Sequence, residues 1–280
     1  MLARLPFSGV ILLCWALGAG CGASASPLPR AALLMDKGQA AEASQLLRDY
    51  LREHPRALPE RRLLVRVEAL RGQLGVAMAE VELLRQQLGP TSPIPWVELG
   101  HALEAAHRYD EALEAFDRAA AVAPRDPLGP LTGGTRAARW GELDWAEPRL
   151  REAVARDPSD SSAWHTLGVV QLSLGNVSAA AEAYRSGLLA DPEALENRIG
   201  LATLALRQGD LAGALLQYDA IVAKRPKLAD AHLGRSFTLL GLGRYPEARL
   251  ALEEATRLGG DPRVIAAQRR ELARLTSGHP

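Results

Sequence analysis

The apolar positions of the chain repeat at a fixed interval. An alanine follows each short glycine-containing turn, and successive alanines are 34, 35, 34, 34, 34 and 34 residues apart. These residues are Ala43, Ala77, Ala112, Ala146, Ala180, Ala214 and Ala248. An interval of this regularity indicates that one structural unit is repeated about seven times.

The third unit shows what kind of structure is repeated. Its aromatic, small and proline residues are Trp96, Leu99, Gly100, Tyr109, Ala112, Phe116, Ala119 and Pro124. Their spacing resembles that of the tetratricopeptide repeat (TPR), a helix-turn-helix unit of 34 residues. The fifth and sixth units share it at Trp164, Leu167, Gly168, Gly175, Ala180, Tyr184 and Pro192, and at Leu201, Ala202, Gly209, Ala214, Tyr218 and Pro226. The resemblance implies an all-α protein, a right-handed α-solenoid of about seven helix-turn-helix units.

Some units depart from the pattern. The first and second are degenerate, the seventh has Gly260 at the usual proline position, and the fourth has Gly133 and Gly134 where leucine and glycine are usual. Each glycine inside a helix weakens it by about 1 kcal/mol relative to alanine. The fourth unit is therefore either a hinge or ligand-accessible site, or a weak repeat that its neighbours hold in place. The predicted units are 24–57, 58–91, 93–126, 127–160, 161–194, 195–228 and 229–262.

The last segment, residues 263–276, carries a different pattern. Its apolar stripe comprises Val264, Ile265, Gln268, Leu272 and Leu275, and arginines occupy much of the remaining surface. Each hairpin of a solenoid leaves one apolar face uncovered, so the last hairpin needs a helix with one apolar face. We predict a C-terminal capping helix, with a partner-binding amphipathic helix as the alternative.

Residues 1–20 have the pattern of a secretory signal peptide. An uncharged apolar run follows Arg4 and ends in small residues. The run is shorter than the roughly 20 residues that a membrane-spanning helix needs. The segment Ala16–Gly22 resembles a bacterial lipobox, which implies that Cys21 is acylated and becomes the first residue of a TPR array over 21–262.

The N-terminal pattern also predicts where the protein is found. A lipobox implies an outer-membrane lipoprotein of the bacterial envelope that faces the periplasm and meets the membrane only through its lipid anchor. The alternative is that Ala23-Ser24-Ala25 is an ordinary cleavage site and the product is a soluble periplasmic protein. The sequence after Cys21 contains no further cysteine, so it has no pair to form a disulfide.

Charge and motif spacing argue against several functions. Lys plus Arg and Asp plus Glu both number 33, so no net positive charge attracts nucleic acid. Glu98 and His101 have the E-x-x-H spacing of di-iron bundles, but no second copy accompanies them. Residues 129–135 lack the lysine of a phosphate-binding loop. We therefore expect no catalytic residue, metal, cofactor, nucleic acid or small-molecule substrate, and no enzymatic activity.

The family resemblance also implies where partners bind. In TPR proteins the first helix of each hairpin lines a concave groove, and its second, fifth, ninth and twelfth positions point into that groove. The candidate groove residues are Arg62, Arg66, His101, Val169, Leu172, Thr203, Leu206, Leu233, Phe237 and Leu240. They change from basic and polar to apolar along the chain, and exposed apolar patches mark binding sites. The alternative is that a tight superhelix buries some of the apolar members.

Together these patterns predict a non-enzymatic scaffold that binds envelope proteins or peptides in its groove. A narrower hypothesis is a similarity in architecture to pilotin-type lipoproteins, which help a secretin ring to assemble. Pilus, motility and secretion complexes are further candidate settings. A soluble periplasmic binding module and a cell-wall-associated enzyme are the alternatives.

Overall fold

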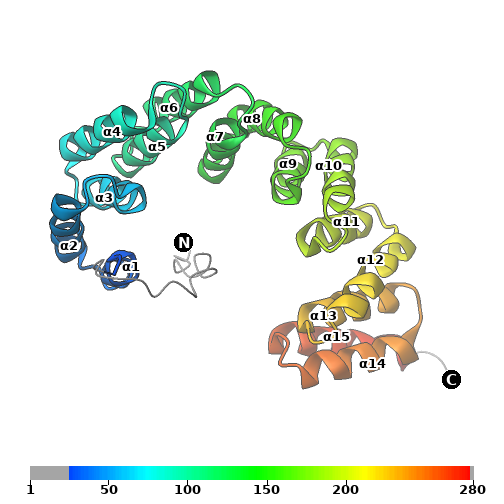
Figure 1. Cartoon of the computed structure of the whole chain (residues 1–280). Coiled ribbons are helices and arrows are strands. Elements are labelled where there is room, and N and C mark those ends of the chain that lie inside the picture. The colour runs from blue at the N-terminus through cyan, green and yellow to red at the C-terminus, as the bar shows by residue number, and fades with distance from the viewer. Residues whose placement is uncertain (1–24, 278–280) are drawn as a thin grey trace. The chain divides into compact units, whose positions relative to one another are not determined.

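The computed structural model describes residues 25–277, and all regular structure in that range is helical (Figure 1). The predicted signal peptide and Cys21 lie outside this range. The helices are α1 Leu28–Asp36, α2 Ala40–Glu53, α3 Leu58–Leu70, α4 Leu74–Leu88, α5 Ile94–Ala105, α6 Tyr109–Val122, α7 Leu128–Trp140, α8 Leu143–Arg156, α9 Ser161–Ser173, α10 Val177–Ala190, α11 Leu195–Arg207, α12 Leu211–Lys224, α13 Ala229–Gly241, α14 Tyr245–Arg257 and α15 Pro262–Thr276. The all-α fold predicted from the repeat is confirmed.

A glycine with positive φ connects the two helices of most hairpins. The left-handed conformation ends the first helix, and glycine adopts it without a steric penalty. These glycines are Gly38, Gly72, Gly141, Gly175, Gly209 and Gly243. In the third hairpin, His107 takes the same place with φ 59°. The turn residue therefore repeats with the same period as the buried alanines.

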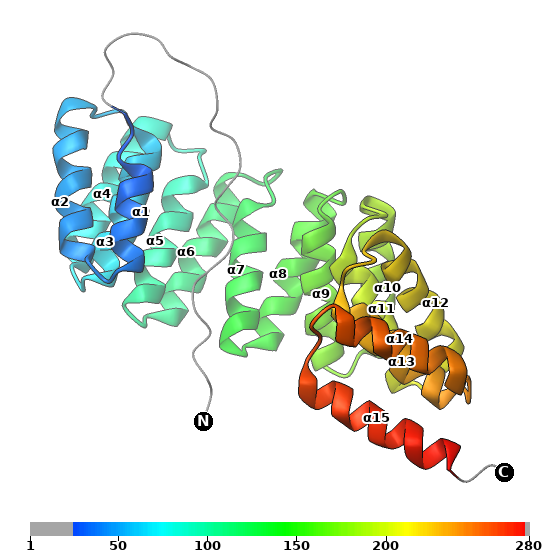
Figure 2. The same cartoon turned by 90° about the horizontal axis from the view of Figure 1, so that it is seen from below.

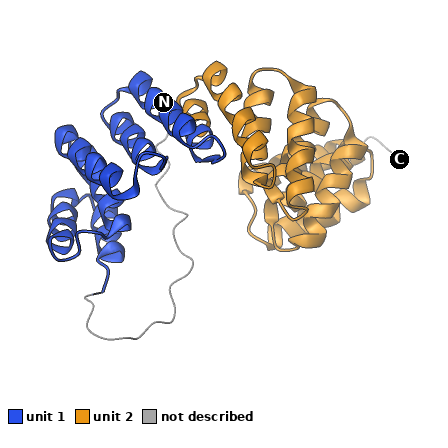
Figure 3. Ribbon diagram, turned by 45° about the horizontal axis from the view of Figure 1, so that its top comes forward, with its two compact units in different colours: residues 1–132 blue, residues 133–280 orange. Residues whose placement is uncertain are grey.

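The chain divides into two compact units, residues 1–132 and 133–280 (Figure 3). In unit 1 the first helices α3 and α5 contact each other, and in unit 2 α9 contacts α11. First helices thus form one layer of each unit and second helices the other (Figures 1 and 2). We call the exposed surface of the first helices the first-helix face of that unit: α1, α3 and α5 in unit 1, and α9, α11 and α13 in unit 2.

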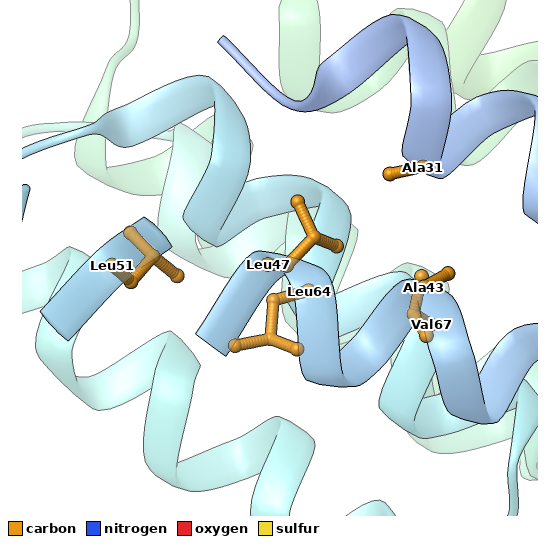
Figure 4. Close-up of a cluster of buried hydrophobic side chains, with 6 residues drawn as sticks. All are labelled: Ala31, Ala43, Leu47, Leu51, Leu64 and Val67. Carbon is orange, nitrogen blue, oxygen red and sulfur yellow. The ribbon is translucent and has the colours of Figure 1, made fainter. Parts of the chain in front are cut away.

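Alanine and leucine fill the space between the layers. All seven alanines of the repeat are fully buried, because only a small side chain fits where two helices approach closely. In unit 1, Leu47 and Leu51 of α2 pack with Leu64 and Val67 of α3 and with two alanines (Figure 4). Burying each such leucine stabilises the fold by about 1.5–3 kcal/mol.

Glycines in the fourth hairpin serve close packing. Helix α7 runs unbroken from Leu128 to Trp140 despite its glycines. A Cβ at Gly129 would collide with the backbone of Ala120, and one at Gly134 would lie 2.7 Å from Cγ of Leu150. Neighbouring helices approach α7 at these two residues. Their packing stabilises the helix although glycine lowers its intrinsic helix propensity.

The last helix covers the end of unit 2. Helix α15 contacts α13 and α14, and it buries Ile265 and Leu272. The side-chain amide of Gln268 donates a hydrogen bond to the backbone carbonyl of Leu233 at 3.1 Å. Within residues 25–277, no helix is both long and apolar enough to cross a membrane.

Candidate protein-binding surfaces

Three apolar side chains are exposed on the first-helix face of unit 2. Val169 of α9 is 43% exposed, Ile199 of α11 is 40% exposed and Phe237 of α13 is 53% exposed. Thr203 of α11 is exposed as well. We call Val169, Ile199 and Phe237 the apolar residues of the first-helix face. Such side chains lose unfavourable contact with water when a partner covers them.

Two predicted groove residues are instead part of the core. Leu233 packs with Leu252, Ala255 and Ile265 and is buried. Leu240 is buried in a cluster that includes Leu215. Both predictions of an exposed position are wrong, because α15 and the neighbouring helices cover these leucines. Their truncation would damage the fold before it changed a binding surface.

The remaining apolar candidates are partly buried. Leu172 packs against a cluster that contains Ala180 and Tyr184, and Leu206 has intermediate exposure. Leu172 and Leu206 therefore add less exposed area to the first-helix face than the three apolar residues named above. The half-buried ring of His165 lies 5.7 Å from the ring of Tyr184. Burial lowers the pKa of His165, although the nearby Glu196 acts in the opposite direction.

The first helices of unit 1 carry a cluster of ion pairs as well as two exposed leucines, Leu33 of α1 and Leu70 of α3. Arg62 and Arg66 of α3 both bind Glu98 of α5, whose side chain is fully buried. Nε of Arg62 donates to Oε1 at 2.7 Å. Nε and Nη2 of Arg66 donate to Oε2 and Oε1 at 2.7 and 2.9 Å. The two predicted cations therefore share one buried counter-ion.

The structure gives Glu98 a different role from the one that its E-x-x-H spacing suggests. His101 lies with its ring centroid 5.5 Å from that of Phe116, and its Nδ1 is 3.6 Å from Glu104. Glu98 turns to the arginines of the preceding hairpin. The described part of the chain holds no cluster of three potential metal-ligating side chains.

The charge of Glu98 is stabilised in place. Burial raises the pKa of this carboxyl, but the hydrogen bonds and charges of Arg66 and Arg62 outweigh burial and leave the pKa below its usual value. Glu98 is therefore ionised at neutral pH. A buried ion is tolerated only when partners of opposite charge compensate the loss of its hydration.

A second buried carboxylate lies between α2 and α3. Glu68 accepts a hydrogen bond from Oγ of Ser44 at 2.5 Å. It also binds Arg48 at 2.8 Å and Arg71 at 2.9 Å. Burial raises the pKa of Glu68, whereas Ser44, Arg48 and Arg71 together lower it further than burial raises it. Sequence reasoning missed this cluster. The available signal was Glu68 itself, because a carboxylate within the mostly apolar segment Leu64–Ala69 is expected to need a partner of opposite charge.

Unit 2 has a cleft of about 720 Å³ along its turns. Its walls are formed by Ser161, Asp191 and residues 193–196 and 224–228. Its charges are of both signs, and Lys224 binds Glu193 at 2.7 Å. The cleft therefore offers no excess charge that would select a ligand.

The repeat pattern and the stacked hairpins agree with the known family. The sequence matches the tetratricopeptide repeat over residues 93–126, 131–195 and 199–263, more than half of the chain. The chain belongs to the tetratricopeptide repeat family. It is accordingly a TPR-type protein-interaction scaffold, and such scaffolds are typically non-enzymatic.

Two characterised relatives share only part of their length with this TPR chain. Protein FlbA of Caulobacter vibrioides is 28% identical over 185 residues, which are 65% of this chain and 30% of FlbA. The heat-shock protein cognate co-chaperone sgt12 of Aspergillus fumigatus is 27% identical over 92 residues, which are 33% of this chain and 27% of sgt12. The chain thus spans less than a third of each relative.

Solved TPR structures show the same fold. The C-terminal part of a TPR repeat-containing protein from Cytophaga hutchinsonii superimposes with a TM-score of 0.63 at 13% identity, covering 85% of this chain and 98% of that one. YrrB, a TPR protein with an unusual peptide-binding site, gives a TM-score of 0.56 at 17% identity, covering 68% and 97%. At these identities the likeness is one of fold.

Proposed function

We propose that this TPR protein holds partner proteins or peptides against the first-helix face of unit 2. The observation that carries the proposal is the exposure of Val169, Ile199 and Phe237 on three successive first helices. Exposed aromatic and aliphatic side chains are the usual energetic anchors of a protein interface. The peptide-binding site named for the similar fold of YrrB is consistent with this use.

We further propose that the scaffold is a lipoprotein of a bacterial envelope. The lipobox-like segment that ends at Cys21 supports this setting. Acylated Cys21 would anchor the array to the outer membrane, where it faces the periplasm. Components of a secretin, pilus, motility or secretion complex are the candidate partners. A soluble periplasmic module is the alternative, and acylation of Cys21 separates the two.

The binding surface is tested with a pair of matched variants. Ile199→Ser and Phe237→Ser together remove two apolar residues of the first-helix face. The control, Leu216→Ser with Leu250→Ser, removes two leucines of second helices that are 67% and 65% exposed. Partners are captured by crosslinking in intact envelopes, and melting temperatures are measured on all three purified proteins.

The proposal expects the first variant to lose its partners while it keeps its melting temperature, and the control to retain them. Anchor residues commonly contribute 2 kcal/mol or more, which corresponds to about thirtyfold in affinity. Full partner recovery by the first variant would contradict the proposed surface. Partner loss by the control alone would assign binding to the second helices, and equal loss by both variants would contradict a surface confined to the first helices.

The anchor is tested by Cys21→Ala. The lipoprotein hypothesis expects this variant to leave the membrane fraction and to keep its signal peptide, because the acylated cysteine is the processing site that the lipobox implies. Fractionation and mass of the purified protein give the answer. A variant that is processed normally and stays at the membrane would rule out lipidation at Cys21.

A further inference from the structure

A small hollow lies on unit 1 among helices α4, α5 and α6. Its volume is about 140 Å³. The apolar part of its lining comprises Met78 of α4, Trp96, Leu99 and Leu103 of α5, and Ala115 of α6. An apolar cavity of about 150 Å³ holds one benzene-sized group. The hollow therefore has room for a single leucine or aromatic side chain.

The rim of the hollow offers a positive charge. The exposed side chain of Arg118 on α6 lies over the ring of Trp96, with its Cζ 5.3 Å from the ring centroid. Among residues 25–277 no carboxylate forms an ion pair with Arg118, and this includes Glu114 of the same lining. Arg108, the other arginine of the lining, is already paired with Glu111. A carboxylate next to an incoming side chain could therefore bind Arg118 through charge-assisted hydrogen bonds.

Unit 2 carries a side chain of matching size beside such a carboxylate. Leu189, in the last turn of α10, is 84% exposed and is the most exposed large apolar side chain of residues 25–277. Asp191 follows it at the C-cap of α10 and is exposed as well. Its Oδ1 accepts a hydrogen bond from the backbone N–H of Glu193 at 2.9 Å. This bond orients the carboxylate, and its second oxygen can accept from a cation.

Two other strongly exposed leucines lack a suitable neighbour. Leu70 is 64% exposed, but Arg71 follows it and would repel the cation at the rim. Leu216 is 67% exposed, but Asp219, the next carboxylate along α12, is already paired with Arg235. Size and charge together therefore favour Leu189 as the side chain that fits the hollow.

We propose that a second copy of this chain occupies the hollow, with Leu189 of one copy inserted among the apolar side chains of the other and Asp191 paired with Arg118. The leucine leaves water for an apolar site, and the ion pair at the rim orients it. The leucine and the hollow are different surfaces, so the contact is heterologous and each copy can both give and accept a leucine. This self-association goes beyond the proposed binding of partners and uses none of the apolar residues of the first-helix face.

The test measures energy transfer between donor-labelled and acceptor-labelled copies of the purified full-length protein, in enough detergent that copies do not share a micelle by chance. The leucine variant Leu189→Ser keeps its hollow, and the hollow variant Met78→Glu keeps its leucine. Met78 is 45% exposed, so a carboxylate there stays hydrated, and it would repel Asp191 of the other copy. Melting temperatures are measured on every variant.

Each variant has a matched control. Leu250→Ser removes a leucine that is 65% exposed and has a carboxylate, Glu253, three residues later. Leu83→Glu introduces a carboxylate on α4 at a leucine that is 39% exposed and does not line the hollow. Both controls should self-associate within about twofold of the wild type.

The proposal expects the leucine variant and the hollow variant each to self-associate about tenfold or more weakly than the wild type, because a buried leucine contributes at least that factor. A mixture of the two should recover to within about threefold of the wild type, since one copy supplies the leucine and the other the hollow. A monomeric wild type, a mixture that does not recover, or an equal loss in the controls overturns the proposal. If Met78→Glu fails to fold, Arg118→Asp replaces it as the hollow variant.

A charge exchange tests the ion pair separately. Arg118→Asp and Asp191→Arg should each weaken self-association, and a mixture of the two variants should restore it because opposite charges meet again. A mixture as weak as its components overturns the assigned pair. Phe237→Ser should self-associate as the wild type does, so failure of this contact and failure of the proposed partner surface give different results.

Discussion

At residue 98 unit 1 carries a buried glutamate, whereas unit 2 carries glycine at the equivalent residues 200 and 234. Gly200 and Gly234 lie against the rings of Tyr184 and Tyr218. In unit 2, a tyrosine ring of the preceding hairpin thus occupies the space beside the glycine. In unit 1, two arginines of the preceding hairpin pair with the glutamate instead. One backbone geometry accepts both arrangements because only the junction between two hairpins changes.

The two arrangements have different physical costs. The tyrosine packing of unit 2 gains from buried apolar area and tolerates little added volume. The carboxylate of unit 1 loses its hydration and depends on both arginines for compensation. Unit 1 should therefore be sensitive to charge and unit 2 to shape.

The largest effect should come from removing the counter-ions of unit 1. Arg62→Gln with Arg66→Gln leaves Glu98 buried without a cation. Breaking a buried ion pair costs about 3–5 kcal/mol. We expect about 3 kcal/mol, because the arginines are 37% and 42% exposed and water can enter where their side chains are shortened. Hydrogen exchange of α3 and α5 measures the loss. The exposed pairs Arg108–Glu111 and Arg244–Glu247 serve as controls, and a loss no larger than theirs would refute the distinction.

A smaller loss should follow from adding volume in unit 2. A Cβ at Gly200 would lie 2.7 Å from ring atoms of Tyr184, so Gly200→Val should cost about 2 kcal/mol through overpacking. The control is Gly75→Val in unit 1, where a Cβ meets nothing within 4 Å. Hydrogen exchange of α10 and α11 should increase only in the first variant. Similar behaviour of both variants would mean that Tyr184 can move aside.

Acid should weaken the two units in different pH ranges. The folded pKa of His165 lies below 6.5 because of burial, so protonation favours unfolding of unit 2 from pH 6.5 downward. The folded pKa values of Glu68 and Glu98 lie below 4.5, so their stabilisation is complete above pH 4.5 and is lost as the pH falls further. Hydrogen exchange of α3 and α9 between pH 7 and pH 3 should show this order. Loss of protection in α3 and α9 at the same pH would contradict this order.

The smallest effect should be a gain. His107 has φ 59° at the turn where the other hairpins have glycine. A left-handed conformation costs a side-chain-bearing residue about 1–2 kcal/mol, and glycine loses about 0.5–1 kcal/mol more entropy on folding. His107→Gly should therefore stabilise the hairpin by about 0.5–1 kcal/mol, as measured by thermal unfolding. A destabilised variant would show that the contact of His107 with the hydroxyl of Tyr109 at 3.0 Å outweighs the strain.

The backbone of this fold could be predicted from sequence because its signals are local. The 34-residue spacing of the alanines and the glycine of each turn depend only on the hairpin in which they lie. Every one of the seven alanines is buried as this register requires. The stability of the fourth hairpin could not be judged from its own residues. Its glycines predict a weak helix, but neighbouring segments approach α7 closely at Gly129 and Gly134.

The surfaces were harder to predict for the same physical reason. Whether Leu233 is exposed depends on Ile265, which lies on another helix. The partner of Glu98 lies 32 and 36 residues away, at Arg66 and Arg62. Position within a repeat thus shows which side chains point outward, and the adjoining repeat decides which of them stay accessible.

The contact between Glu98 and the arginines of α3 limits how freely the repeats of this protein could be exchanged. The carboxylate belongs to the third repeat, but the charges that it neutralises belong to the second. Deleting or duplicating either repeat would leave an ion without its counterpart, whereas glycine and tyrosine junctions recur in unit 2. Changes in repeat number, through recombination or by design, should therefore be tolerated between the later repeats and rejected between the second and third.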